Sequence, residues 1–377
     1  MAVLGGGSGQ SILEEHLFIE SCTFSPWANC TALVTVVGGG GSGGTGQYIG
    51  GYSNGAATGG GAGGCGKSLL SLSKDVTYTI TAGAGGPVTT PQNLTAKPGQ
   101  TGGNSSFGES GQAALITANG GGAGAGVNGA AHQSVSASGA SGGTSSGGNL
   151  FNTTGGGSGS VAVTFAAPSG HYSNNYVTGG GAVGLYGEDG FASGSIANGG
   201  AGAVYTSRYY GTGGGGLGAA GGDLDPSSQV NKFSYGGPGL RGAKPTGTTS
   251  GNRLPGSYLM GLPQGVVNSL DSPFTASGPL AMGSLLSGNF TAFQMEGVGV
   301  GGNGSRTNTY YPFGGLFAGG GGGIGNSSNS VSGGNGYLGS GGGAFGAYNA
   351  SNSTATVRIP GAGGDGFIVI QILNWSI

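Results

Sequence analysis

The chain has 377 residues, 99 of them glycine, and its ten Lys and Arg against twelve Asp and Glu give a formal net charge of -2. Only 6% of residues are charged, and no basic stripe is present, so nucleic acid is a poor partner. The longest apolar runs reach about a third of the length needed to span a bilayer, so we expect no membrane insertion. No charged n-region and apolar stretch open the sequence, which predicts synthesis in the cytoplasm without a signal peptide.

The glycines form runs, such as residues 38–41 and 319–323, rather than occupying every third position as in collagen. Glycine and proline together reach the range of disordered chains, which is one alternative. An extended glycine chain otherwise favours a threefold helix of polyproline II shape, whose N–H and C=O groups point sideways. Neighbouring segments can satisfy these groups. We therefore expect a bundle of such helices, lying outside regular strands, over residues 38–66, 119–130, 178–202 and 314–343.

Alternating apolar residues predict strands at 16–24, 31–37, 68–82, 112–118, 160–166 and 364–375. Turns are expected at Pro26–Trp27 and at Lys74–Asp75. The last strand is apolar on both faces, which favours a central, buried position. Because strands open and close the chain, the expected fold is all-β: a small antiparallel β-sandwich that holds the termini together, joined to the glycine-helix bundle, with little or no α-helix.

The domain organisation follows from this pattern and from one shift in composition. We expect a short N-terminal leader at residues 1–15, used for attachment, and a single glycine-rich domain at 16–377. Residues 223–296 hold 12 of the 99 glycines but 7 of the 14 prolines, with aromatic residues that do not alternate as in a strand. Such a Pro-rich irregular loop segment on a rigid scaffold favours a functional role. Capping of the bundle end is the alternative.

Residues 61–68, GAGGCGKS, match the phosphate-loop pattern, with Gly61 and Gly66 in place and Lys67 and Ser68 as the phosphate and Mg²⁺ contacts. A phosphate loop needs a buried strand before it and a helix after it. Here a glycine-rich stretch precedes the match and an alternating strand pattern follows it. We therefore interpret the match as accidental and expect no nucleotide binding.

No catalytic or metal-binding constellation is apparent, so we expect no enzyme activity, no metal and no cofactor. The acidic pairs lack the tandem repeats of a calcium-binding array, and the cysteines form no CxxC pair. The residues considered are Glu188, Asp189, Asp223, Asp225, Cys22, Cys30 and Cys65. Cys22 and Cys30 could face each other across a turn, but buried unbridged thiols are the favoured interpretation.

Four segments follow one another in order: LVTVVGGGGSGG (33–44), TYTITAGAGG (77–86), GGNSSFG…LITANGGGAGAG (102–126) and GAGGDGFIVIQI (361–372). Together they resemble the glycine-rich domain of tailed-bacteriophage tail fibre and tail tip proteins, over roughly residues 20–377. The resemblance implies a lattice of polyproline II-like helices that displays variable loops to a host surface. Only about 15 residues precede the domain, and segment 223–296 matches no family motif, so receptor contacts do not transfer residue by residue.

By this resemblance we expect a virion protein of the phage tail, an adhesin that meets a bacterial surface protein or glycan through loops. Its other partners would be virion tail proteins, and a homotrimer is left open. Alternatives are a purely structural tail or decoration protein and an ice-binding protein. Aromatic residues could supply flat receptor contacts, or pack over glycine backbone instead. These candidates are Tyr209, Tyr210, Phe233, Tyr235, Tyr258, Phe274, Tyr310 and Tyr311.

Overall fold

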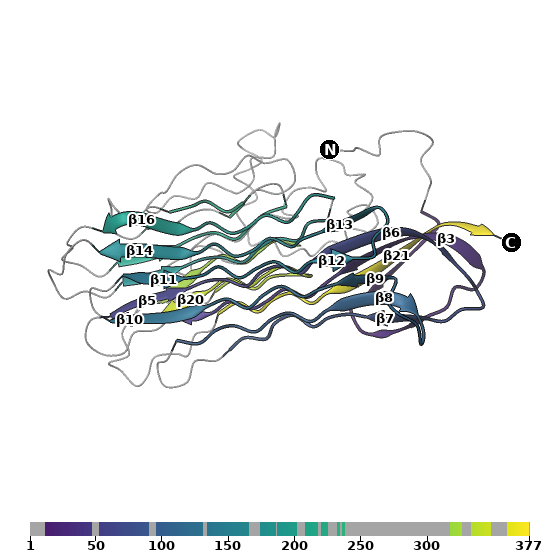
Figure 1. The fold of residues 1–377 in the computed structure, drawn as a ribbon, viewed down its shortest axis with the longest axis horizontal. Coiled ribbons are helices and arrows are strands. Elements are labelled where there is room, and N and C mark those ends of the chain that lie inside the picture. Colours follow the sequence, from purple (N-terminus) through teal and green to yellow (C-terminus); the bar gives the residue numbers. More distant parts are fainter. Residues whose placement is uncertain are drawn as a thin grey trace, which may run out of the picture.

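The computed structural model describes residues 12–46, 53–89, 96–130, 134–165, 174–185, 187–201, 208–217, 220–224, 232–233, 236–237, 317–325, 333–347 and 360–376. Within these ranges the chain is all-β, and no helix occurs. Strands gather at the two ends of an elongated molecule, and glycine-rich passes run between the ends (Figure 1). The expected all-β class is therefore confirmed for the described residues.

At one end, two antiparallel five-stranded sheets face each other. In sheet order, the first contains β1 (Glu14–Phe18), β21 (Phe367–Ser376), β3 (Asn29–Val37), β6 (Cys65–Leu72) and β13 (Phe151–Thr153). The second contains β12 (Ser145–Ser146), β9 (Ile116–Ala118), β8 (Ser105–Glu109), β7 (Tyr78–Thr81) and β2 (Cys22–Phe24). This is the expected antiparallel sandwich, and β1 pairs with β21 near the two ends of the chain. Leu13 already donates its N–H to Ile372, so the sandwich begins before residue 16.

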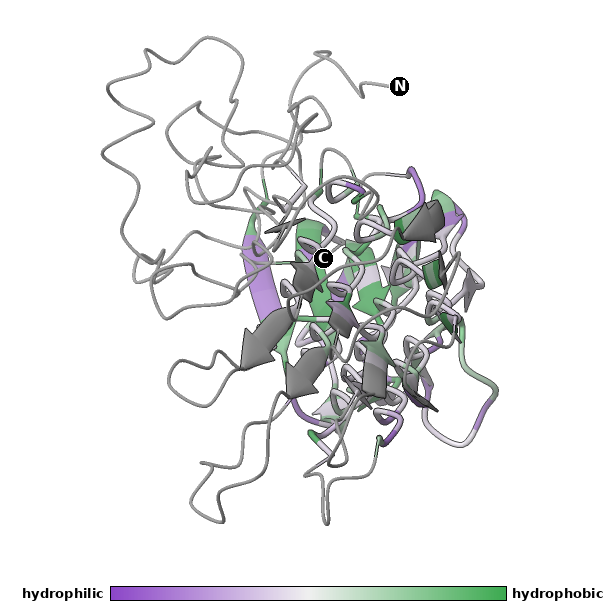
Figure 2. Cartoon of the chain, turned by 90° about the vertical axis from the view of Figure 1, so that its left-hand side faces the viewer, coloured by the Kyte–Doolittle hydropathy of each residue, from purple (hydrophilic) through white to green (hydrophobic). Residues whose placement is uncertain are grey.

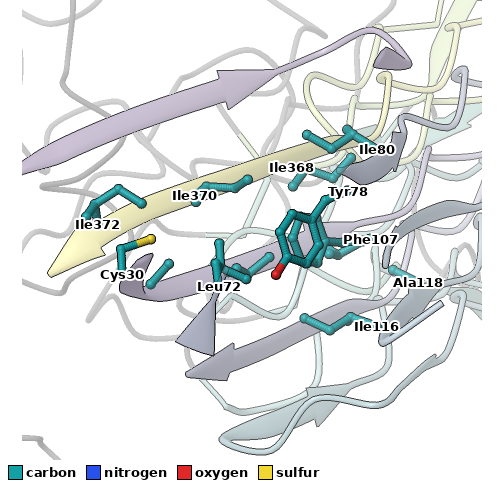
Figure 3. Close-up of a cluster of buried hydrophobic side chains, with 13 residues drawn as sticks. Cys30, Leu72, Tyr78, Ile80, Phe107, Ile116, Ala118, Ile368, Ile370 and Ile372 are labelled. Atoms are coloured by element: carbon teal, nitrogen blue, oxygen red, sulfur yellow. The ribbon is translucent and has the colours of Figure 1, made fainter. Parts of the chain in front are cut away.

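The sandwich core lies between these two sheets (Figure 3). Its buried members are Cys30, Ala32, Val34, Val36, Leu72, Tyr78, Ile80, Phe107, Ile116, Ala118, Ile368, Ile370 and Ile372. The segment 68–82 forms two strands in facing sheets rather than one, with a turn at Lys74–Asp75, yet its alternating residues all reach this core. Residues 367–372 of β21 are fully buried, as its two apolar faces predict, because its other face packs against Phe317 and Leu185.

Three further sheets form the opposite end, here called the distal end. The third sheet contains β10 (Gly126–Ala130), β5 (Ser53–Ala57), β15 (Asn174–Val177), β17 (Arg208–Gly211) and β18 (Lys232–Phe233). The fourth contains β11 (Val135–Ala137), β14 (Val161–Phe165) and β16 (Ile196–Ala201). The fifth contains β19 (Gly323–Gly325), β20 (Phe345–Ala347) and β4 (Thr45–Gly46).

The distal sheets correct three expectations. The glycine-rich ranges 38–66, 119–130, 178–202 and 314–343, expected to lie outside regular strands, contain β5, β10, β16 and β19. The strand expected at 160–166 is β14, which lies in the fourth sheet and not in the sandwich. Several distal pairs are parallel, including β5 with β15 and β15 with β17. Parallel pairing arises because these strands enter their glycine passes in the same direction. A small core of Val161, Val163, Ile196 and their neighbours lies at this end.

The glycine passes are connected by hydrogen bonds between neighbouring segments, as expected. In the pass 38–44, every backbone N–H donates to another segment over 2.8–3.0 Å. The acceptor changes with a period of three residues: Gly38, Gly41 and Gly44 donate to Gly64, Gly61 and Thr58; Gly39 and Ser42 to Gly103 and Gln100; Gly40 and Gly43 to Gly364 and Gly361. Each third residue therefore points its amide at the same neighbour.

The carbonyl groups of the same pass reach three other segments. Gly39 and Ser42 accept from Gly121 and Gly124, Gly40 accepts from Gly86, and Gly41 accepts from Gly342. Pass 38–44 is therefore surrounded by segments around residues 58–64, 97–103, 361–364, 121–124, 86 and 342. All seven amides and four of the carbonyls of this pass are thus hydrogen-bonded without a sheet around it. Figure 2 shows the passes packed side by side behind the distal strands.

Glycine is required in these passes for its missing side chain rather than for its flexibility. Added Cβ atoms on Gly38, Gly40 and Gly41 would each overlap a backbone carbonyl of a neighbouring segment. Positive φ occurs instead at four described glycines, Gly111, Gly147, Gly187 and Gly339, where left-handed backbone suits glycine best. All four lie in turns on the sandwich side. The backbones of the array are thus packed at distances that no other residue allows.

Candidate functional site

The described residues that flank eight connections of the chain lie at the distal end. Its strands are joined through residues 47–52, 90–95, 131–133, 166–173, 202–207, 225–231, 326–332 and 348–359. In sequence these connections are rich in Ser, Asn, Thr and Tyr, and Asp225 and Arg358 are their only charged residues apart from histidine. By contrast, short turns join most passes at the sandwich end, for example at Gly111 and Gly147. The distal end is therefore the candidate site.

Three of the predicted contact residues lie in the third sheet. Tyr209 and Tyr210 belong to β17 and stand opposite Asn175 and Tyr176 of β15. Phe233 belongs to β18 and stands opposite Gly211. The structure thus brings these three residues together on neighbouring strands at the distal end. The other candidates lie outside the described residues: Tyr235, Tyr258, Phe274, Tyr310 and Tyr311.

Three buried threonines lie where strands of the distal end continue into the glycine passes. Thr58, Thr178 and Thr212 follow β5, β15 and β17 directly, and the parallel register places them level with one another. Gly59 donates its N–H to Oγ1 of Thr178 over 3.2 Å, and Gly179 donates to Oγ1 of Thr212 over 3.3 Å. The hydroxyls of Thr178 and Thr212 therefore each accept an amide from the pass that follows the neighbouring strand, whereas Oγ1 of Thr58 accepts the N–H of Ala125, just before β10, over 2.8 Å.

The same hydroxyl groups also act as donors. Oγ1 of Thr58, Thr178 and Thr212 donates to the carbonyls of Ser138, Gly159 and Gly194 respectively, over 2.8–3.1 Å. Each threonine thus ties its own pass to two other segments. All three side chains are fully buried, where these bonds are not exchanged with water. The connections at the distal end consequently start from strands whose positions are fixed.

These threonines were missed in the sequence-based prediction, although a signal exists. The tetrapeptide Thr-Gly-Gly-Gly occurs at 58–61, 154–157, 178–181 and 212–215, each time directly after a short segment that proves to be a strand; the copy at 154–157 follows β13 at the sandwich end. A β-branched residue favours the strand, and its hydroxyl can replace a backbone partner where the ladder ends. The repeated tetrapeptide therefore marks the junction of strand and glycine pass.

The phosphate-loop match has a different role in the fold. The N–H groups of Gly61, Ala62, Gly63 and Gly64 donate to the carbonyls of Gly122, Gly156, Gly339 and Asn119. A phosphate loop would direct these amides at an anion. The residues after them enter strand β6 rather than a helix, and Ser68 Oγ accepts from the N–H of Asn149 over 2.9 Å. In this arrangement the amides belong to the glycine array.

Lys67 and Cys65 are both buried, on the face of β6 that points away from the sandwich core. The Lys67 ammonium lies 6.0 Å from the ring centroid of Phe151 on the adjacent strand. Burial lowers the pKa of Lys67, and the nearby Cys65 opposes this with a smaller effect. Burial raises the pKa of Cys65 to about 12, which keeps the thiol protonated and unreactive at neutral pH.

The three cysteines are unbridged. Cys30 and Cys65 are buried, as expected, but Cys22 is exposed. Cys22 lies in β2 of the second sheet and Cys30 in β3 of the first, so the corner at Pro26–Trp27 carries the chain from one sheet to the other. This corner does not form a hairpin that would pair the two thiols.

Three aspartates accept hydrogen bonds from backbone amides at the edge of the array. Oδ1 of Asp189, Asp223 and Asp365 accepts the backbone N–H of Thr154, Ser195 and Gly85, over 2.7–2.9 Å. Asp225 lies outside the described residues. Within the described ranges no group of three or more His, Cys, Asp or Glu side chains is placed to hold a metal ion. These three carboxylates thus take the place of backbone carbonyl acceptors at the edge of the array.

Comparison with known protein families identifies the fold unit. The family model described as a glycine-rich domain matches residues 19–243, more than half of the chain. The chain belongs to the glycine-rich domain family. The folded unit extends beyond the match, because β21 inserts between β1 and β3 of the first sheet. No curated protein matches the sequence. Among the described residues, no helix has the length and apolar character needed to cross a membrane.

Proposed function

We propose that this glycine-rich domain is a bacteriophage virion protein, a tail fibre or tail tip adhesin that recognises a host cell-surface receptor through its distal connections. The observation that carries the proposal is the division of the molecule into two ends. The first and last strands of the described residues, β1 and β21, lie in the sandwich, whereas the strands that flank the connections 47–52, 166–173 and 202–207 lie at the opposite end. The four sequence segments that resemble tail fibre and tail tip proteins supply the virion context.

The glycine array suits the scaffold of such a protein. We infer that its passes are polyproline II-like helices, because their amides change direction with the period of three residues that this helix has. Pass 38–44 is bonded on all sides, so bending it would break several backbone hydrogen bonds at once. A stiff scaffold fixes the strand ends from which the connections start, and fixing these ends lowers the entropy cost of binding.

The composition of the distal connections supports contact with a receptor. Tyrosine, serine and asparagine are also the residues that dominate antibody binding loops, because rigid rings supply contact area and small polar groups supply adaptable hydrogen bonds. Tyr48, Tyr52, Tyr172 and Tyr205 belong to these connections. The receptor is then a bacterial surface protein or glycan, and binding involves no catalysis.

Segment exchange tests the proposal. Replacing the connection 166–173 or 202–207, or the Pro-rich segment 223–296, with a sequence of equal length is expected to change host adsorption while particles still assemble. A matched control replaces the sandwich-side turn 110–114, which joins β8 to β9. Unchanged adsorption together with failed assembly would instead favour a purely structural tail protein.

A further inference from the structure

The outer face of the first sheet, which points away from the sandwich core, carries large apolar side chains. The strand register places two rows of side chains on this face, across β1, β21, β3 and β6: Leu17, Val369, Thr35 and Lys67 in one row, and Glu15, Gln371, Leu33 and Leu69 in the other. Leu17 is 45% exposed and Leu69 is 42% exposed. Apolar side chains that share an exposed face are typical of a surface that another segment or molecule covers.

The outer face of the second sheet has a different composition. Small hydroxyl side chains occupy the outward positions of β2, β7, β8 and β9, where the register aligns Thr23 with Thr79, and Thr81 with Ser106 and Thr117. Such side chains hydrogen-bond to water and are typical of a solvated sheet face. The two outer faces of one sandwich are therefore suited to different surroundings, water on the second sheet and a packed partner on the first.

Two polar atoms on the outer face of the first sheet are buried without a hydrogen-bond partner among the described residues, Oγ1 of Thr35 and Oε1 of Gln371. Gln371 donates through Nε2 to Oε2 of Glu15 over 2.7 Å, so its carbonyl oxygen is left as an acceptor. Buried polar atoms of folded proteins are almost always hydrogen-bonded. The partner that covers this face consequently brings hydrogen-bond donors as well as apolar side chains.

The chain itself returns to the described structure on this same face. The described residues stop at Gly237 and resume at Phe317. Phe317 is fully buried, its ring centroid lies 5.5 Å from that of Phe367 in β21, and its carbonyl accepts the N–H of Val183. Phe367 has the same outward orientation as Gln371, which lies about 13 Å further along the strand. The residues directly before Phe317 therefore begin within reach of the two rows.

We propose that residues 297–316 dock on the outer face of the first sheet. The apolar residues of this stretch are Val298, Val300, Tyr310, Tyr311, Phe313 and Leu316. They cover Leu17 and Leu69, while polar groups of the same stretch donate to Oε1 of Gln371. Tyr310 and Tyr311 then pack on the sandwich and are not receptor contacts, so the proposal does not depend on the adhesin function.

Limited proteolysis of the purified full chain tests the docking, because Arg306 is the one trypsin site within residues 297–316. In the wild type, cleavage after Arg306 should be at least about tenfold slower than cleavage after Arg253, which lies in the Pro-rich segment, because proteolysis requires an opened chain. Leu17→Glu places a charge beneath the docked stretch and should accelerate cleavage after Arg306 at least about tenfold. Mass spectrometry of the fragments measures each site separately.

Leu115→Glu is the matched control, because Leu115 is 41% exposed but lies in the second sheet, directly before β9. It should leave cleavage after Arg306 unchanged. Lys67, buried in β6, should stay uncleaved in every folded variant; if Leu17→Glu unfolds the chain, the two wild-type rates decide alone.

Equal wild-type rates at Arg306 and Arg253 would overturn the proposal, as would equal effects of Leu17→Glu and Leu115→Glu. Rapid cleavage after Arg306, together with a lower unfolding temperature on deletion of residues 1–11, would place the N-terminal residues on this face instead. A concentration-dependent self-association that Leu17→Glu abolishes would assign the face to a second copy of the chain.

Discussion

Gly59 donates its backbone N–H to Oγ1 of Thr178, 119 residues further along the chain, and this hydroxyl donates in turn to the carbonyl of Gly159. One side chain thus joins three glycine-rich passes at the base of the distal end. Backbone groups that a sheet would pair are satisfied here by a hydroxyl, which can accept and donate at the same time. The threonine therefore determines how the passes lie relative to one another.

Replacing Thr178 with valine should lower the free energy of unfolding by about 2–4 kcal/mol. Valine keeps the shape but leaves the N–H of Gly59 and the carbonyl of Gly159 without their partner, and each unsatisfied buried group costs about 1–3 kcal/mol. Thr178→Ser keeps the hydroxyl and should cost less than about 1 kcal/mol. Denaturant unfolding of both variants measures the difference. Equal losses would show that the methyl group, not the hydrogen bonds, matters.

Gly41→Ala should prevent folding. The added Cβ would overlap the carbonyl of Gly122 in a neighbouring pass, so two backbones must separate and several of their hydrogen bonds must break. Since typical stabilities are about 5–15 kcal/mol, two or three such losses are decisive. Gly111→Asn is the control, because Gly111 has φ +79° with open space around it and asparagine tolerates that conformation. Circular dichroism and thermal unfolding compare the two, and a cooperative transition of Gly41→Ala near that of the wild type would contradict the close packing.

Thiol labelling should distinguish the three cysteines. In the native protein at neutral pH a maleimide should label Cys22, which is exposed, and leave Cys30 and Cys65 unlabelled until the chain unfolds. Mass spectrometry of the labelled peptides identifies the sites. Rapid labelling of Cys65 without unfolding would show that the face of β6 is open to solvent.

The raised pKa of Cys65 also predicts a pH dependence of stability. Its pKa moves from 9.0 to about 12 in the folded protein, so the unfolded chain loses the thiol proton first as the pH rises. The contribution of this thiol to stability is therefore complete below about pH 9 and is lost as the pH rises towards 12. Cys65→Ala should remove this part of the dependence between about pH 9 and pH 12. An identical pH profile in both proteins would contradict the burial of Cys65.

Lys67→Met should leave the free energy of unfolding unchanged or raise it by about 1 kcal/mol at neutral pH, because methionine keeps an apolar stem beside Phe151 and removes a buried charge. Because burial lowers the pKa of Lys67, the cost of its charge disappears above pH 10.5, and any gain should disappear with it. Lys67→Ala should instead cost about 2 kcal/mol through lost packing. Calorimetric titration of the wild type with Mg-ATP should show no saturable binding; binding that Lys67→Met abolishes would restore the phosphate-loop interpretation.

The sequence predicted the sandwich well because its strands bury side chains. Alternating apolar residues located β3, and the two apolar faces of β21 predicted its buried position. Apart from β14, whose alternating residues were also recognised, the distal strands gave no such signal. Strands such as β5, with the sequence SNGAA, are paired in register with β10 and β15 where the glycine passes end, so few apolar side chains mark them.

The candidate site was harder to predict for the same reason. Tyr209, Tyr210 and Phe233 were chosen for the chemistry of their rings, and the structure places them on neighbouring strands. The threonines that position these strands act through one hydroxyl each and were not distinguished from the many other threonines of the chain. Which segments become neighbours depends on the order of the passes in space, and a run of glycines carries no side-chain pattern from which that order could be read.

The hydrogen bonds of pass 38–44 have a consequence for biosynthesis. Gly40 and Gly43, among the first residues of the array to leave the ribosome, donate to Gly364 and Gly361, which are among the last. Pass 38–44 therefore cannot be fully enclosed until residues 361–364 have been translated, and the amides of Gly40 and Gly43 must remain hydrated or temporarily paired until then. The glycine array is therefore completed only when residues 361–364 pack beside pass 38–44, unlike an array of repeats in which each repeat packs on the one before it. A nascent chain shortened before residue 361 would leave the amides of Gly40 and Gly43 without their acceptors.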